Sequence, residues 1–315
     1  MIQILFLVGL LSFPNVLSAT DQKKLPVEFI VNGKNITDEY KTTLKQEKPD
    51  QDAFLTFKNY KVLLVPGFLS NEIRDLKVVP HSGKVGDYFD DQMKWLKSQE
   101  IDHLLVEINS EETNEFNAKL IRKEIENSDR PVIIISHSKG GLDTLEALLF
   151  GDEAIRTKVK AWVPLNSPFQ GTPLADAFLK NQIVRYMVEK TVEALGGKIG
   201  SVQSMTLNAR FKYQEKNQIQ IKALLQKTKT ISLATWKKHE SNRIDSTLEL
   251  IIQYIESLGY ENDGAVPWKS AVLADSEYVV IEGVDHLMTI QETPFSSFDR
   301  TKMTEALFLM LAKRL

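Results

Sequence analysis

Short apolar runs alternate with amphipathic stretches from about residue 60 to the end of the chain. The runs typical of buried strands are residues 60–65, 103–108, 132–136, 159–165, 230–236 and 277–282. Between them apolar residues recur at helical spacing, and we expect helices at residues 87–97, 111–126, 246–258 and 301–313. Strands that alternate with helices of this length predict an α/β fold, with a mostly parallel sheet covered by helices on both faces.

One long segment interrupts this alternation. Residues 181–195 carry a wide apolar stripe at helical period, and a second helical stretch runs from about 202 to 226. Two or three helices are therefore inserted between consecutive strands. We expect residues 168–228 to form a helical cap over the functional site, whose candidate residues are given below. Extra packing helices without a gating role are the alternative.

The N-terminal region differs from the rest in pattern. Residues 2–11 are an uncharged apolar run, and small or apolar residues end at Ala19 before a polar stretch, which predicts a secretory signal of residues 1–19 with cleavage after Ala19. The run is too short to span a bilayer. Further on, residues 27–31 followed by Asn32-Gly33 predict a β-hairpin. We expect residues 20–315 to form one domain.

Composition narrows the classes of function. The chain has 315 residues and a formal net charge of −3, so charge gives no reason to expect nucleic acid or an anionic membrane as a partner. It has no cysteine, which excludes disulfides and thiolate metal sites. An exported chain without disulfides fits the bacterial periplasm or the medium. We expect no cofactor and predict no metal.

The residues from Pro131 to Phe150 combine a buried strand, a tight turn and a helix. Five mostly β-branched residues, 132–136, lead into His137-Ser138-Lys139-Gly140-Gly141, after which leucines recur at helical spacing. A serine on such a turn projects its hydroxyl above the carboxyl end of the sheet, as in a nucleophile elbow. The turn needs small neighbours. Gly140 meets that need, while Ser136 stands where glycine is usual.

A serine nucleophile needs a base that a third group orients. Of five histidines, His286 follows the last strand, where a loop can reach back over the sheet end, and we predict it as the base. Asp263, in an Asn-Asp-Gly turn, is the predicted acid because Ser138, Asp263 and His286 follow the chain order of hydrolase triads on this kind of sheet. Asp275 and Asp285 are the alternative acids.

A developing oxyanion needs two backbone donors. One is the N–H of Lys139, directly after the serine. The other should come from the loop after the first main strand, where Gly67 permits close approach and the N–H of Phe68 can face the oxyanion, with Leu69 as the alternative.

Five segments together resemble the α/β-hydrolases of the lipase and esterase kind. They are VLLVPGFLSN (62–71), IISHSKGG (134–141), NSPFQGTPLAD (166–176), NDGAVP (262–267) and GVDHL (283–287). The resemblance covers roughly residues 60–313 and implies hydrolysis of carboxylic esters through an acyl-enzyme. In similar lipases the segment matching 166–176 starts the lid. This chain departs from the pattern at Ser136, at Lys139 and at Pro66, where a histidine is frequent.

The expected substrate is a small-molecule or lipid ester, with transient contact to a lipid interface through the cap. A polyester depolymerase, a thioesterase or an acyltransferase would use the same three side chains. A catalytically silent binding protein on this fold is the non-enzymatic alternative.

Overall fold

The computed structural model describes residues 27–46, 50–70, 88–239, 248–293 and 297–315. Their centre is one parallel six-stranded sheet in the order β2-β1-β3-β4-β5-β6. The strands are β1 (Lys61–Val65), β2 (Asp102–Leu105), β3 (Val132–His137), β4 (Val159–Leu165), β5 (Lys229–Trp236) and β6 (Glu277–Glu282). After β2 the chain returns past β1 to β3, so the strand order reverses between β1 and β3, which is where ligands bind in sheets of this type.

Two hydrophobic layers cover the two faces of this sheet, and the central strand β3 contributes to both. Its residues Val132 and Ile134 belong to one buried cluster, whereas Ile133 and Ile135 belong to the other. All six residues of β3 are buried, so the strand needs apolar side chains on both faces. This explains why a continuous apolar run, rather than an alternating one, marks it in the sequence.

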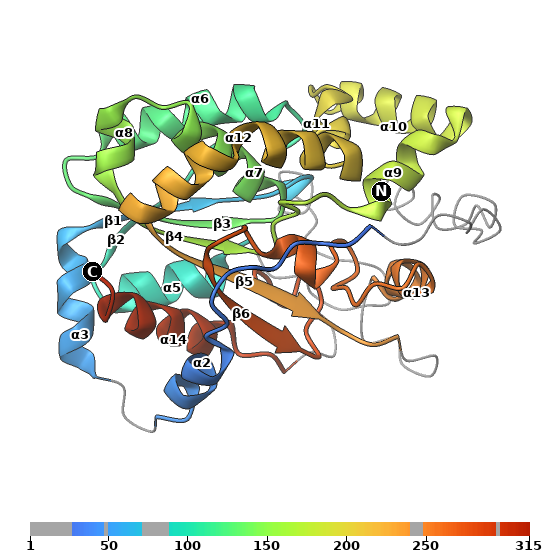
Figure 1. The fold of residues 1–315 in the computed structure, drawn as a ribbon. Helices are drawn as coiled ribbons and strands as arrows, with labels where there is room; N and C mark the ends of the chain where they lie inside the picture. Colours follow the sequence, from blue (N-terminus) through green and yellow to red (C-terminus); the bar gives the residue numbers. More distant parts are fainter. Residues whose placement is uncertain (1–26, 47–49, 71–87, 240–247, 294–296) are drawn as a thin grey trace.

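Helices lie on both sides of the sheet (Figure 1). The upper layer in that view holds α6 (Asn114–Asn127), α7 (Lys139–Leu149), α8 (Glu153–Lys158) and α12 (Leu207–Lys227). The lower layer holds α2 (Thr37–Leu44), α3 (Gln51–Leu55), α5 (Asp90–Ser98) and α14 (Arg300–Ala312). The remaining helices are α9 (Pro173–Lys180), α10 (Gln182–Ala194), α11 (Gly200–Gln203), α13 (Glu249–Ser257) and the 3₁₀ turns η2 (Thr56–Asn59) and η3 (Trp268–Ala271). The α/β fold predicted from the sequence is confirmed.

The inserted segment between β4 and β5 contains four helices, and they do not share one role. Helix α12 contacts α7 and α8, and its Ile221 and Leu224 join the buried cluster of the upper layer. It is therefore a packing helix of the sheet. Helices α9 and α10 lie toward the end of the molecule to which β5 and β6 point (Figure 1). A covering role for residues 168–228 stays a prediction, and α9 and α10 are the part to which it applies.

The predicted hairpin at residues 27–33 is wrong. This segment is extended and runs to the edge strand β6, where the Ile36 amide donates to the Tyr278 carbonyl at 2.9 Å and the Tyr278 amide donates to the Lys34 carbonyl at 2.9 Å. A methyl group on Gly33 would lie 1.9 Å from the Ser276 carbonyl oxygen, so this glycine serves close approach between two segments. The open edge of β6 outcompetes the local turn.

The boundaries of the other elements move by a few residues. The predicted strand 103–108 is shorter, and the helix predicted from residue 111 begins at Asn114. Thr113 is its N-cap and accepts from the Phe116 amide at 3.3 Å.

The predicted signal, residues 1–19, lies outside the described residues. Among the described helices, none combines the length and the apolar character needed to cross a membrane.

Candidate active site

Ser138 lies in a strained turn between β3 and α7. Its backbone has φ 53° and ψ −131°, a region that costs energy for a residue with a side chain and that is found at functional sites. Its amide donates to the Leu165 carbonyl at 2.9 Å, which fixes the turn to the neighbouring strand. A methyl group on Gly140 would lie 2.2 Å from the Pro66 carbonyl oxygen, and one on Gly141 would lie 1.9 Å from the Ser167 hydroxyl. Helix α7 can approach the sheet only because both positions lack a side chain.

Ser136 has a structural reason to replace glycine. Its buried hydroxyl accepts a hydrogen bond of 2.8 Å from the indole nitrogen of Trp162, on the neighbouring strand β4. Trp162 is fully buried, and its N–H would otherwise have to be desolvated without a partner. The departure from G-x-S-x-G thus satisfies a polar group of the core.

His286 and Asp263 form a buried pair. The Nδ1 of His286 lies 2.7 Å from Oδ2 of Asp263, and the His286 amide donates to the Asp263 carbonyl at 2.8 Å. The other carboxylate oxygen accepts from the amides of Ala265 at 2.9 Å and Val266 at 2.7 Å. A carboxylate that accepts at Nδ1 selects the tautomer whose Nε2 carries a free lone pair, which is the form a general base requires.

The alternative acids have other partners. Oδ1 of Asp285 accepts from the amides of Leu287 and Met288, each at 3.0 Å, so this carboxylate caps a turn. Asp275 is bound to Asn32, whose side-chain amide donates to it at 2.7 Å.

The imidazole of His286 lies against the residue that precedes the serine. The ring centroids of His137 and His286 are 4.5 Å apart. The Ser138 hydroxyl itself makes no hydrogen bond to His286 here, although both residues are described. Such bonds are frequently long in free enzymes and tighten when substrate binds. The structure therefore brings the predicted base and the predicted acid together, next to the turn that carries Ser138.

The loop after β1 comes within contact distance of the serine. A methyl group on Gly67 would lie 2.7 Å from Cβ of Ser138, so only glycine fits. The Gly67 amide is bound to the hydroxyl of Tyr88 at 3.0 Å. Within the described part of the chain, the amides of Phe68 and Lys139 have no acceptor, and that of Lys139 belongs to the first turn of α7, where intrahelical acceptors are missing.

The side chain of Lys139 points away from the serine into the upper layer. It is fully buried, and its ammonium lies 3.0 Å from Asp143, one turn along α7. The amide of Asn117 donates to the same carboxylate at 3.0 Å. Burial raises the pKa of Asp143 to about 6, against the opposing effect of the Lys139 ammonium. The side chain of Lys139 thus belongs to the core, and its backbone N–H is the part that the predicted oxyanion site would use.

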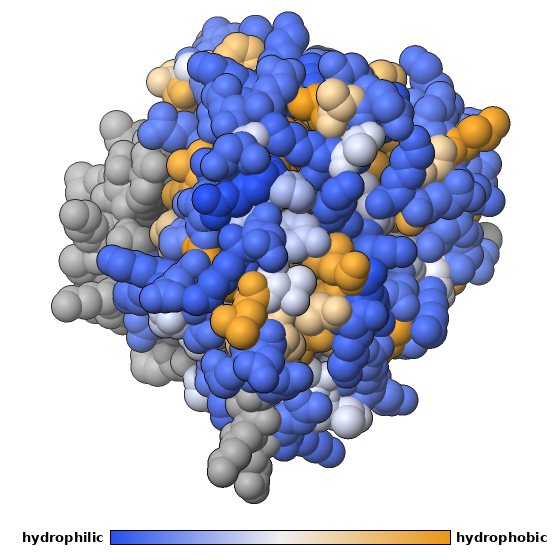
Figure 2. Space-filling view, turned by 90° about the vertical axis from the view of Figure 1, so that its left-hand side faces the viewer, coloured by the Kyte–Doolittle hydropathy of each residue, from blue (hydrophilic) through white to orange (hydrophobic). Residues whose placement is uncertain are grey.

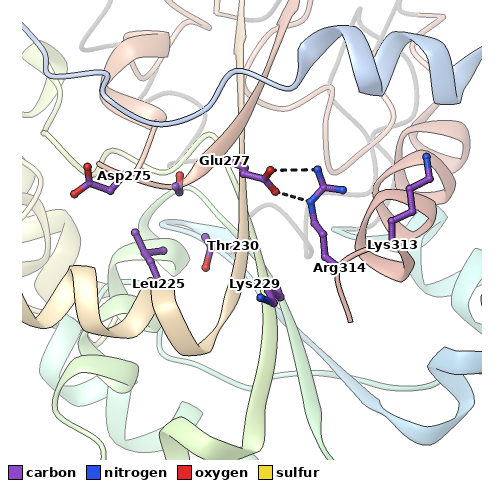
Figure 3. Close-up of a pocket in the computed structure, with 8 residues that line it drawn as sticks. Leu225, Lys229, Thr230, Asp275, Glu277, Lys313 and Arg314 are labelled. Atoms are coloured by element: carbon purple, nitrogen blue, oxygen red, sulfur yellow. Dashed lines mark hydrogen bonds and ion pairs between the residues drawn. The ribbon is translucent and has the colours of Figure 1, made fainter.

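A separate hollow of about 480 Å³ lies where β5 and β6 begin, the end of the strands opposite Ser138 (Figure 3). Its arginine is paired with two carboxylates, since Arg314 binds Glu277 and also Glu39 on α2, the latter at 2.7 Å. We regard it as a structural junction. No group of three acidic or histidine side chains that could hold a metal occurs among the residues the structure describes.

The parallel sheet and its strained serine turn define the α/β-hydrolase fold. Solved structures with this architecture include a metagenomic carboxyl esterase (19% identity, TM-score 0.64), which matches over 82% of this chain and 77% of its own. The mature lipase BlEst2 of Bacillus licheniformis (21% identity, TM-score 0.59) matches over 84% of this chain and 94% of its own. The Staphylococcus hyicus lipase (14% identity, TM-score 0.53) matches over 81% and 96%. The chain has the fold of these esterases and lipases.

In sequence, the chain is 29% identical over 144 residues to phospholipase A(1) LCAT3 of Arabidopsis thaliana. This alignment covers 42% of the chain but only 29% of the plant protein. No protein-family model matches the chain.

Proposed function

We propose that the protein is a serine hydrolase of carboxylic esters. His286 removes the proton of Ser138 as the hydroxyl oxygen attacks the ester carbonyl, and Asp263 holds the imidazole in the required tautomer. The alcohol leaves with the proton that His286 returns to it. Water, activated by the same imidazole, then attacks the acyl-enzyme and releases the acid.

The backbone amides of Phe68 and Lys139 bind the oxyanion in this proposal. Each such donor contributes roughly 3–4 kcal/mol to transition-state stabilisation in comparable sites. The observation that carries the proposal is the buried His286–Asp263 pair, with its 2.7 Å contact, next to the strained Ser138 turn. The fold shared with lipases and esterases supports it.

Turnover of p-nitrophenyl butyrate and octanoate tests the proposal. We expect wild-type protein to hydrolyse both esters and Ser138→Ala to lose at least about 10⁴-fold in kcat, because removing the nucleophile of comparable triads costs more than that. The matched control is Ser98→Ala, at the end of α5, which should keep wild-type kcat. Equal turnover by wild type and Ser138→Ala would refute the proposal.

The partial likeness to a phospholipase A(1) adds one specific substrate class. We propose that glycerophospholipids are among the esters cleaved, with the chain acting at the sn-1 position. A phosphatidylcholine with two different acyl chains tests this, since release of the sn-1 acid alone is expected. Hydrolysis of short esters without any release from this lipid would confine the protein to other esters.

A further inference from the structure

A chain of three hydrogen bonds runs beneath Ser138. The Gly67 amide donates to the Tyr88 hydroxyl at 3.0 Å. The Tyr88 hydroxyl lies 2.5 Å from Nδ1 of His137, and Nε2 of His137 lies 3.0 Å from the carbonyl oxygen of His286. Tyr88, His137 and His286 are all buried, with exposed fractions of 3%, 1% and 7%.

The direction of every bond in this chain is determined by chemistry. A carbonyl oxygen only accepts, so Nε2 of His137 must carry the hydrogen. A neutral imidazole has one N–H, so Nδ1 accepts and the Tyr88 hydroxyl donates to it. The oxygen of Tyr88 then accepts from Gly67. Burial, and next the neighbouring His286, lowers the pKa of His137 well below its ordinary value, which keeps the ring neutral and this direction intact.

The chain joins the parts of the proposed site that come from distant segments. Gly67 directly precedes Phe68, whose amide is the proposed oxyanion donor. His137 directly precedes the nucleophile. His286 supplies the base, and its amide and ring are both held by Asp263.

We infer that Tyr88 and His137 are positioning residues of the ester hydrolase. They fix the loop that carries Phe68 and the loop that carries His286 relative to each other and to Ser138. The inference rests on the proposed function. The polar atoms of both side chains are used in the chain itself. Both act through the atoms to which they are bound.

A purely structural role makes a different prediction. If the two side chains only stabilised the core, their removal would lower the unfolding temperature and leave the folded fraction with normal kinetics. A positioning role lowers kcat of folded protein at little change in KM, because misplacement affects the transition state more than substrate binding. It also makes losses non-additive, since either substitution breaks the same chain.

The test compares Tyr88→Phe, His137→Leu and the double variant on p-nitrophenyl butyrate, each checked for folding by circular dichroism. The matched control is Tyr40→Phe, which removes a buried phenol hydroxyl from α2. We expect kcat of Tyr88→Phe to fall about 10-fold with KM within about twofold, since small misplacements cost up to about 100-fold. The double variant should be within about twofold of His137→Leu, and Tyr40→Phe should match wild type.

Wild-type kcat in folded Tyr88→Phe would overturn the inference, and so would losses that multiply in the double variant. If His137→Leu does not fold, His137→Asn and His137→Gln replace it. The first retains an acceptor near Nδ1 and the second a donor near Nε2, so each breaks one link, and each should lower kcat. Wild-type turnover that depends on Ser138 separates this result from failure of the proposed function, because an inactive wild type would overturn both.

Discussion

The strained backbone of Ser138 fits its surroundings because three nearby positions are glycines without a side chain. Gly140 and Gly141 admit the helix, and Gly67 admits the loop that carries the proposed oxyanion donor. These residues could be predicted in part. Glycines after a serine between a strand and a helix are a local signal, and so is the order Ser138, Asp263, His286. The chain through Tyr88 and His137 could not be predicted, because it depends on contacts between residues 21, 49 and 149 positions apart.

Gly67→Ala tests the close approach at the serine. The added methyl would meet Cβ of Ser138 at 2.7 Å and the His137 carbonyl oxygen at 2.9 Å, so the loop must move away. We expect kcat for p-nitrophenyl butyrate to fall by about 100-fold, the cost of a displacement near 1 Å at a reacting group. Gly200→Ala is the control, because the nearest atom to its methyl would be 3.3 Å away. Wild-type kcat in Gly67→Ala would contradict the placement.

His137 should also give folding stability a pH dependence. Burial lowers its pKa well below 6.5, whereas in the unfolded chain it takes up a proton below about pH 6.5. Its contribution to stability is thus fully present above pH 6.5 and is lost as pH falls, by about 1.4 kcal/mol per unit. In urea unfolding at pH 5–8, the stability difference between wild type and His137→Leu should be constant above pH 6.5 and shift by this slope below it. A difference that does not change with pH would show that His137 binds its proton equally well in the folded and the unfolded state.

At the scale of elements, apolar periodicity predicted all six strands and most of the helices, because burial on two faces leaves a strong pattern. It did not distinguish the packing helix α12 from α9 and α10, for which a covering role stays a prediction, since each kind of helix carries an apolar stripe. The turn signal at Asn32-Gly33 was misleading because the pairing partner of that segment, β6, lies more than 240 residues away. Side-chain pairing between β3 and β4 likewise has no local signal.

Restoring glycine at position 136 should weaken the protein rather than improve it. Ser136→Gly removes the acceptor of the 2.8 Å bond from Trp162 and leaves a buried N–H unsatisfied. We expect a loss of about 1–3 kcal/mol in the free energy of unfolding, with ester turnover retained. In a Trp162→Phe background the same change should cost less, because no donor remains. An equal cost in both backgrounds would show that the hydrogen bond contributes nothing.

At the scale of the molecule, one end of the sheet carries the candidate site and the other has a structural role. The carboxyl ends of the strands carry the candidate site, and the amino ends carry paired charges that tie the C-terminal helix α14 to β6 and α2. Figure 2 shows the side on which the C-terminus lies, and its surface is mostly hydrophilic with apolar residues in small separate patches. We therefore expect charge substitutions at this end to change stability and not catalysis.

Arg314→Gln tests this division. The guanidinium binds Glu39 at 2.7 Å and the Met310 carbonyl at 2.7 Å in addition to Glu277, so its loss should cost about 1–3 kcal/mol in urea unfolding. Turnover of p-nitrophenyl butyrate should be unchanged. Lys313→Gln is the control, because that side chain is 57% exposed and its ammonium makes just a long contact of 4.0 Å with Glu39. This substitution should cost less than about 1 kcal/mol. Equal costs for the two variants would contradict the junction described above.

In the proposed mechanism Ser138 is a nucleophile that His286 and Asp263 activate. Labelling the wild-type protein with a fluorophosphonate and mapping the modified peptide measures this most directly, because the reagent bonds to an activated serine. We expect one adduct, on Ser138 in the segment Ser136–Gly141, and a rate of labelling that falls at least about 100-fold in His286→Ala. An adduct on another serine, no adduct at all, or equal labelling of His286→Ala would contradict this mechanism.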